Sequence, residues 1–170
     1  KIPGTYAMTA EEHAVASALY CREAVRSGLT TFVEFGVGGE SGYGDDVVEA
    51  KLDSYAAAGV RNAYAHSFMD RRPDDRFLDY LDSVAEKEPT VDHVEATPQD
   101  TDAALDATES LIEAYHGSRD GRQSIWPAPI RAFGATPEGL RGAVELAERY
   151  DVMTTAHVAE APEQEHAVNS

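Results

Sequence analysis

Two side chains near the end of the sequence, His157 and Glu160, have the types and spacing that hydrolytic chemistry needs. His157 lies at the carboxyl end of a predicted parallel strand, and Glu160 follows three residues later in the connection beyond it. In parallel α/β sheets and barrels, ligands bind at this edge. A neutral imidazole there can ligate zinc or iron, and a nearby carboxylate can carry a proton from activated water to a leaving nitrogen. The same position also suits a histidine that only hydrogen-bonds to backbone.

Two other polar side chains lie near the ends of predicted strands. Glu34 is near the end of the first strand and His66 near the end of the second, so both are candidates for facing a barrel mouth and binding substrate. For Glu34 we favour a structural hydrogen bond to neighbouring backbone, and for His66 both interpretations stay open. Arg131, just past the third predicted strand, could hold an anionic group or pair with one of the many acids, and we favour the pairing. Surface positions on helices and connections are expected for the remaining histidines: His13, His93, His116 and His166.

The glycine-rich segment 36–44 (GVGGESGYG) supports an alternative hypothesis. It follows a predicted strand and precedes a predicted helix, which is the context of a dinucleotide-binding turn. The G-x-G-x-x-G pattern fails at its last position, where Ser41 stands, and Glu40, Asp45 and Asp46 would place negative charge beside a pyrophosphate. A small α/β domain that binds a nucleotide or another ligand through this segment is the alternative to an enzyme.

The elements that must position these residues alternate between strands and helices. Thr9 and Glu12 form a capping-box pattern that predicts a helix over 9–27, and Thr136 followed by Pro137 predicts the start of the last one. Strands are predicted at 29–35, 60–68, 122–130 and 152–158, and helices between them at 45–58, 73–88 and 100–116. This order predicts an α/β fold with a parallel sheet that helices cover.

The charge balance argues against two classes of partner. The 170 residues carry 31 acidic and 14 basic side chains, a formal net charge of -17, which repels phosphate backbones and anionic lipids. Neither a nucleic acid nor a membrane is therefore expected as a partner.

The single cysteine, Cys21, is expected to pack in the core and suits a reducing cytoplasm. Because the acids are spread along the chain, we also expect a halophilic surface adapted to high salt.

Four short motifs resemble the amidohydrolase superfamily, and within it the aminohydrolases that act on triazines, guanine, cytosine and adenosine derivatives. The tetrad from His157 to Glu160 (HVAE) resembles the end of the fifth barrel strand of that family. Three more segments resemble the second, third and fourth barrel strands of the family, in that order: GLTTF from Gly28, GVRNA from Gly59 and WPAPI from Trp126. The four motifs occur in the order of the family and cover nearly the whole chain.

The resemblance implies part of a (β/α)8 barrel, its second to fifth strands, with residues 1–170 forming a single α/β domain that is a fragment of the barrel. It implies that His157 ligates one divalent metal, zinc rather than iron, and that Glu160 carries the proton. The metal would activate a hydroxide that attacks a carbon bearing nitrogen in a small substrate, a cyclic amidine or a nucleobase-like ring, and releases ammonia or an amine. The His-x-His and the later ligands of the family are absent from this sequence, so activity of the chain alone is not expected. A homo-oligomer is compatible with the family.

Overall fold

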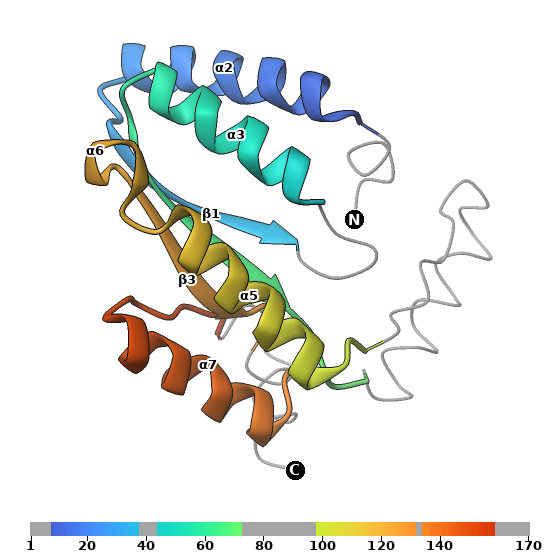
Figure 1. Cartoon of the computed structure of the whole chain (residues 1–170). Coiled ribbons are helices and arrows are strands. Elements are labelled where there is room, and N and C mark those ends of the chain that lie inside the picture. The colour runs from blue at the N-terminus through green and yellow to red at the C-terminus, as the bar shows by residue number, and fades with distance from the viewer. Residues whose placement is uncertain (1–7, 38–43, 73–97, 132–133, 159–170) are drawn as a thin grey trace, which may run out of the picture.

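The computed structural model describes residues 8–37, 44–72, 98–131 and 134–158, which build a parallel sheet with helices packed against it (Figure 1). Its strands are β1 (Thr31–Val37), β2 (Arg61–Phe68) and β3 (Gln123–Pro129), in the order β1-β2-β3. Both neighbouring pairs are parallel, and Phe35, Ala65 and Trp126 lie in register across the sheet. The predicted α/β class with a parallel sheet is therefore confirmed, and three of the four predicted strands are present within a few residues.

The helices begin where local capping signals predict. Helix α2 (Ala10–Arg26) starts with the predicted capping box, in which the Glu12 amide donates to Thr9 Oγ1 and the Thr9 amide donates to Glu12 Oε2 at 2.7 Å. The bounds of the other three helices that sequence predicts within the described ranges are α3 (Asp45–Ala57), α5 (Thr101–Tyr115) and α7 (Pro137–Tyr150). The predicted helix at 73–88 lies outside the described residues.

Helix α2 buries a face of small and polar residues and leaves large apolar residues exposed. Its buried residues are His13, Ser17, Cys21 and Ala24, which recur every three or four residues. Val15 and Leu19 are each 56% exposed. The surface position expected for His13 is therefore wrong, because this histidine lies on the face that packs against α3. The expectation that Cys21 packs in the core is confirmed, since the cysteine is fully buried.

The core fills the space between the sheet and the helices. Its larger cluster joins Tyr64 and Ile125 of the strands to residues of α2, α3 and α5, and a smaller one surrounds Phe68 near α7. The ring of Tyr64 lies so close to Gly36 that a Cβ there would be 1.9 Å from its Cζ and OH atoms. Even-numbered residues of β1 and β2 thus face the helices. Residues 35, 65 and 126 have the opposite parity within their strands and face away from them.

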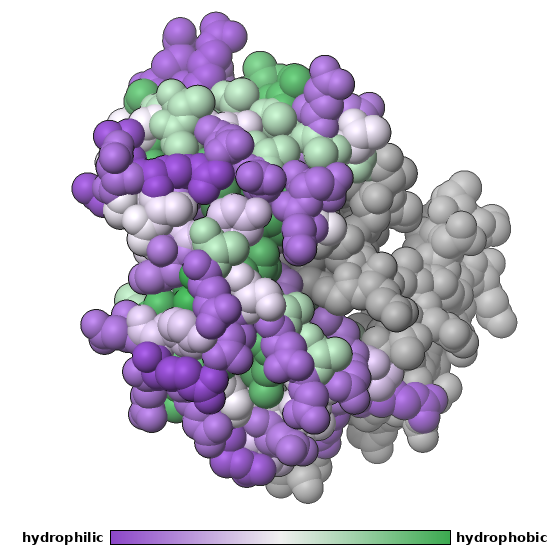
Figure 2. Space-filling model, viewed as in Figure 1, coloured by the Kyte–Doolittle hydropathy of each residue, from purple (hydrophilic) through white to green (hydrophobic). Residues whose placement is uncertain are grey.

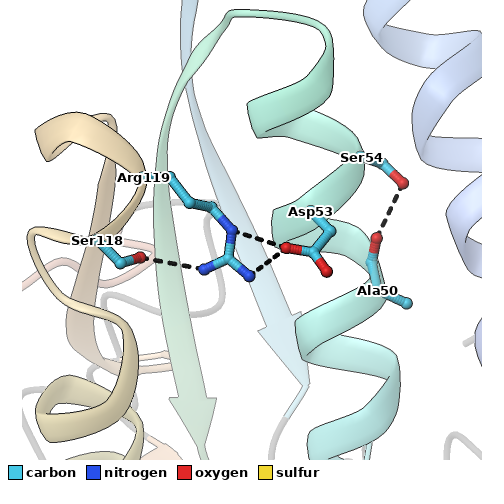
Figure 3. Close-up of polar contacts among 5 residues, drawn as sticks. All are labelled: Ala50, Asp53, Ser54, Ser118 and Arg119. Atoms are coloured by element: carbon cyan, nitrogen blue, oxygen red, sulfur yellow. Dashed lines mark hydrogen bonds and ion pairs between the residues drawn. The ribbon is translucent and has the colours of Figure 1, made fainter.

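A short left-handed turn, α6 (Ser118–Gly121), joins α5 to β3. Arg119 and Asp120 have φ values of 53° and 60°, a conformation that costs energy for residues other than glycine. Figure 3 shows how Arg119 is held: its Nε donates to Asp53 Oδ1 of α3 at 2.8 Å, and its Nη1 donates to the Ser118 hydroxyl at 3.1 Å. The contact ties this connection to α3.

Among the described helices, none combines the length and apolar character needed to cross a lipid bilayer.

Candidate active site at the carboxyl edge of the sheet

The segment that carries His157 runs beside β3 but does not form the strand predicted at 152–158. Only one isolated parallel bridge, between Arg131 and His157, joins it to the chain beyond β3. The His157 amide donates to the Ile130 carbonyl at 3.3 Å, and the Thr154 hydroxyl donates to the Pro127 carbonyl at 2.8 Å. The predicted strand is therefore corrected to an extended segment that follows β3 without a regular ladder.

The amide groups on the outer edge of β3 explain the missing ladder. The carbonyl of Pro127 accepts from Thr155, so the odd-numbered residues of β3 present their backbone groups to this segment. Pro127 and Pro129 have no N–H to donate. The N–H of Ile125, on the same edge, donates to His116 Nδ1 at 3.3 Å. The outer edge of β3 therefore has no free amide at these three positions.

The side chain of His157 lies on the face of the sheet that points away from the helices. Its imidazole stacks on the ring of Phe35, with centroids 4.1 Å apart and planes 24° from parallel. Phe35 and Trp126 flank the small Ala65 in one row across the three strands. In barrels this face is the interior, where bulky side chains of alternate strands share a layer. His157 thus lies at the carboxyl edge of the sheet and on its inner face.

Glu34 faces the helices instead of that inner face. Tyr55 of α3 donates to Glu34 Oε2 at 2.6 Å, and Lys51 forms an ion pair with Oε1. Burial, followed by the nearby Glu34 carboxylate, raises the pKa of the Tyr55 hydroxyl above its usual range. Burial also raises the pKa of Cys21, with Glu34 adding to the effect. The Glu34 carboxylate therefore links β1 to α3 through polar contacts. A role of Glu34 in substrate binding stays a prediction.

His66 also faces the helices, because it shares its parity with Tyr64 and Phe68 of the core. It is 4% exposed, and its Nδ1 lies 2.8 Å from Thr108 Oγ1 of α5. Thr108 uses its one hydroxyl proton to donate to the Ala104 carbonyl at 2.8 Å, so His66 Nδ1 carries the proton and donates to Thr108. Burial lowers the pKa of His66 to about 4, while Asp45 acts in the opposite direction. Of the two interpretations left open for His66, the structure does not show the orientation toward a barrel mouth, and substrate binding by His66 stays a prediction.

Asp70, which the sequence analysis does not single out, organises the same edge of the sheet. It follows β2 and is 8% exposed. Its carboxylate accepts from the Thr136 amide at 2.8 Å, from the Thr136 hydroxyl at 2.6 Å and from the Thr101 hydroxyl at 2.9 Å. A Cβ on Gly139 would lie 2.3 Å from Asp70 Oδ2. An acid directly beyond a buried strand, together with two threonines at predicted helix starts, is the sequence signal for this contact.

The described residues supply one candidate metal ligand. Within them, no group of three or more His, Cys, Asp or Glu side chains is arranged to hold a metal ion. Nor does either ring nitrogen of His157 hydrogen-bond to another described side chain or backbone group. His157 therefore suits one position of a metal site that other residues would have to complete. Glu160 and residues 38–43 of the glycine-rich segment lie outside the described residues.

Comparisons of the sequence identify relatives over most of the chain. The model of the amidohydrolase family matches residues 4–169. The 8-oxoguanine deaminase of Pseudomonas aeruginosa is 40% identical over 70 residues, which cover 41% of this chain and 16% of the deaminase. The S-triazine hydrolase of Gordonia rubripertincta is 29% identical over 108 residues, which cover 64% of this chain and 22% of the hydrolase.

Solved structures share the fold. The atrazine chlorohydrolase of Arthrobacter aurescens TC1, solved with zinc, superposes with a TM-score of 0.66 and 20% identity, covering 92% of this chain and 31% of that chain. The guanine deaminase of E. coli gives a TM-score of 0.64 and 22% identity, covering 95% of this chain and 32% of that chain. The chain thus spans about a third or less of the proteins it matches, and its sheet is part of a (β/α)8 barrel.

Proposed function

Because the chain belongs to the amidohydrolase family, we propose that it contributes to an enzyme that hydrolyses a non-peptide C–N bond. The substrate class is a cyclic amidine or a nucleobase-like ring, and the reaction is a deamination. The observation that carries the proposal is the position of His157 at the carboxyl edge of the sheet, on the face that forms a barrel interior. The relatives named for 8-oxoguanine and triazine substrates support the choice of a flat nitrogen heterocycle.

His157 is assigned as a ligand of one divalent metal, zinc rather than iron. When bound, such a metal lowers the pKa of water and stabilises negative charge that develops on the substrate. Within this chain, the hydrogen bond from the His157 amide to Ile130 holds the backbone of the ligand against the end of β3. The structure solved with zinc supports the choice of metal.

Glu160 is assigned as the proton carrier. It follows His157 by three residues, and a carboxylate placed next to the reacting atoms can accept a proton from water and release it to a leaving nitrogen. Its location beyond the described residues leaves this role resting on the resemblance of the HVAE tetrad. A cytoplasmic location is proposed with it, on the ground that Cys21 is a buried free thiol.

Two substitutions in the full-length enzyme test the assignment. His157→Ala is expected to lose metal and activity together, whereas Glu160→Gln is expected to keep the metal and lose turnover by at least about 100-fold. Metal content by mass spectrometry and deamination rates measured with guanine and triazine compounds check both. His116→Asn is the matched control, because His116 is an exposed histidine at the end of α5 and its removal should affect neither. Turnover retained by Glu160→Gln would refute the proton-carrier role.

A further inference from the structure

We propose that Phe35 is a positioning residue that fixes the ring plane of His157 and thereby its ability to act as a ligand. The inference rests on the proposed function for the ligand role, but the ring contact itself is a feature of the fold. The two residues come from segments more than a hundred positions apart, and their rings meet on the inner face of the sheet with centroids 4.1 Å apart.

Within the described part of the chain, His157 has no hydrogen bond of the kind that usually fixes a ligating imidazole. A metal-bound histidine normally donates its other ring N–H to a carboxylate, a backbone carbonyl or water, and this hydrogen bond sets the ring orientation. Among the described residues no such partner contacts His157. The χ2 torsion of histidine is broad and roughly two-fold, so an unrestrained ring would sample many planes. The flat ring of Phe35, 24° from parallel, restricts that rotation.

The sheet holds Phe35 in a defined place for this contact. Its strand pairs with β2 along the whole of β1, and Phe35 lies in register with Ala65. Ala65 carries only a methyl group, so the neighbouring strand leaves room for the phenyl ring on the inner face. The His157 backbone is fixed separately by its hydrogen bond to Ile130. One end of the histidine is therefore held through β3 and the other through β1.

The parent and four variants test this inference by NMR of histidine Hε1 resonances in the metal-free full-length enzyme. The His157 signal, identified by its loss in His157→Ala, is expected at an upfield shift that the stacked ring produces. Phe35→Leu should remove this shift, and Phe35→Tyr, which keeps the ring, should retain it. Phe32→Leu is the matched control, because Phe32 lies three residues away on the same strand and contacts Tyr20 and Tyr55 on the helix side. An unchanged His157 signal in Phe35→Leu would overturn the contact.

Zinc affinity, measured by competition with a chromogenic chelator, tests the consequence. Phe35→Leu is expected to weaken zinc binding about 10-fold, at the lower end of the effect of groups that orient metal ligands. Phe35→Tyr and Phe32→Leu should bind as the parent does. Equal affinity of Phe35→Leu and the parent would reduce the stack to packing and refute the positioning role. If the parent binds no zinc, the proposed metal function fails while the NMR result still decides whether Phe35 orients the ring.

Discussion

At His66, burial and a single hydrogen bond determine both the charge and the tautomer of a histidine. The ring is enclosed between β2 and α5, donates through Nδ1 to Thr108, and has its pKa lowered to about 4. A protonated ring would be buried with no carboxylate of the described residues in hydrogen-bonding contact, and the attraction of Asp45 offsets only part of that cost. The fold therefore selects the neutral form of this residue.

This selection predicts a loss of stability in mild acid. The pKa of His66 is 6.5 in the unfolded chain and about 4 in the folded one, so between these values the unfolded state binds more protons and stability falls as the pH is lowered. The His66 contribution to this loss is roughly 3 kcal/mol over the whole window. Urea unfolding from pH 7.5 to pH 4 should show it. His66→Asn should have a shallower slope, and parallel curves for the two proteins would contradict the assignment.

The position of a residue along its strand was easier to predict than the face of the sheet on which its side chain lies. The end of the strand predicted at 152–158 puts His157 at the carboxyl edge, and the structure places His157 beside the carboxyl end of β3 although that strand is not formed. Glu34 and His66 are candidates for facing the barrel mouth, with a structural hydrogen bond favoured for Glu34 and both interpretations open for His66, but each lies at an even position of its strand and faces the helices. A shift of one residue exchanges the two faces of a strand, and sequence alone does not fix that parity when both faces are buried in a barrel.

Among the elements, the starts of α5 and α7 are joined by one carboxylate. Asp70 accepts hydrogen bonds from Thr101, at the first residue of α5, and from Thr136, which caps α7. The Ile130 amide donates to the Phe68 carbonyl of β2, and the Ile130 carbonyl accepts from His157. The segment from Phe68 to Asp70 therefore holds the starts of two helices. It is also linked to His157, through the two backbone hydrogen bonds of Ile130.

Removal of this carboxylate should destabilise the fold strongly. Asp70→Ala leaves three partly buried donors without their acceptor and is expected to lower the free energy of unfolding by about 2–4 kcal/mol. Asp70→Asn, which keeps one acceptor oxygen, should lose less. Denaturant unfolding measures both, with Asp102→Ala as the control because Asp102 is an exposed acid in the first turn of α5. A loss no larger than that of Asp102→Ala would contradict the bridging role.

Helix positions were predictable because their signals are local. Thr9, Asp100 and Thr136 each accept a hydrogen bond from an amide three residues later, and a cap needs only its own neighbours in sequence. The face that α2 buries was not predictable in the same way. It packs Ser17 near the Tyr55 hydroxyl, which itself donates to Glu34, so a polar contact between three elements selects that face.

At the scale of the whole molecule, the dominant property is a large excess of negative charge. The formal net charge is -17, and hydrophilic residues cover most of the face seen in Figure 2, with apolar patches between them. Ion pairs among the described residues, such as those of Arg119 with Asp53 and Arg149 with Glu109, leave most acids unneutralised, because acidic side chains outnumber basic ones by 31 to 14. Repulsion between the remaining carboxylates opposes the compact state, and salt screens that repulsion.

The folded state is therefore expected to need salt. Raising potassium chloride from dilute buffer to molar concentration should increase the Tm by about 5 °C or more, which corresponds to about 2 kcal/mol for a domain of this size. The variant Asp106→Asn/Glu145→Gln/Glu148→Gln removes three exposed negative charges from α5 and α7 and should respond less to salt. Circular dichroism melts of both proteins check this. If the Tm of the parent stays constant across that range, self-repulsion does not limit its stability, and the acidic surface requires an explanation other than adaptation to salt.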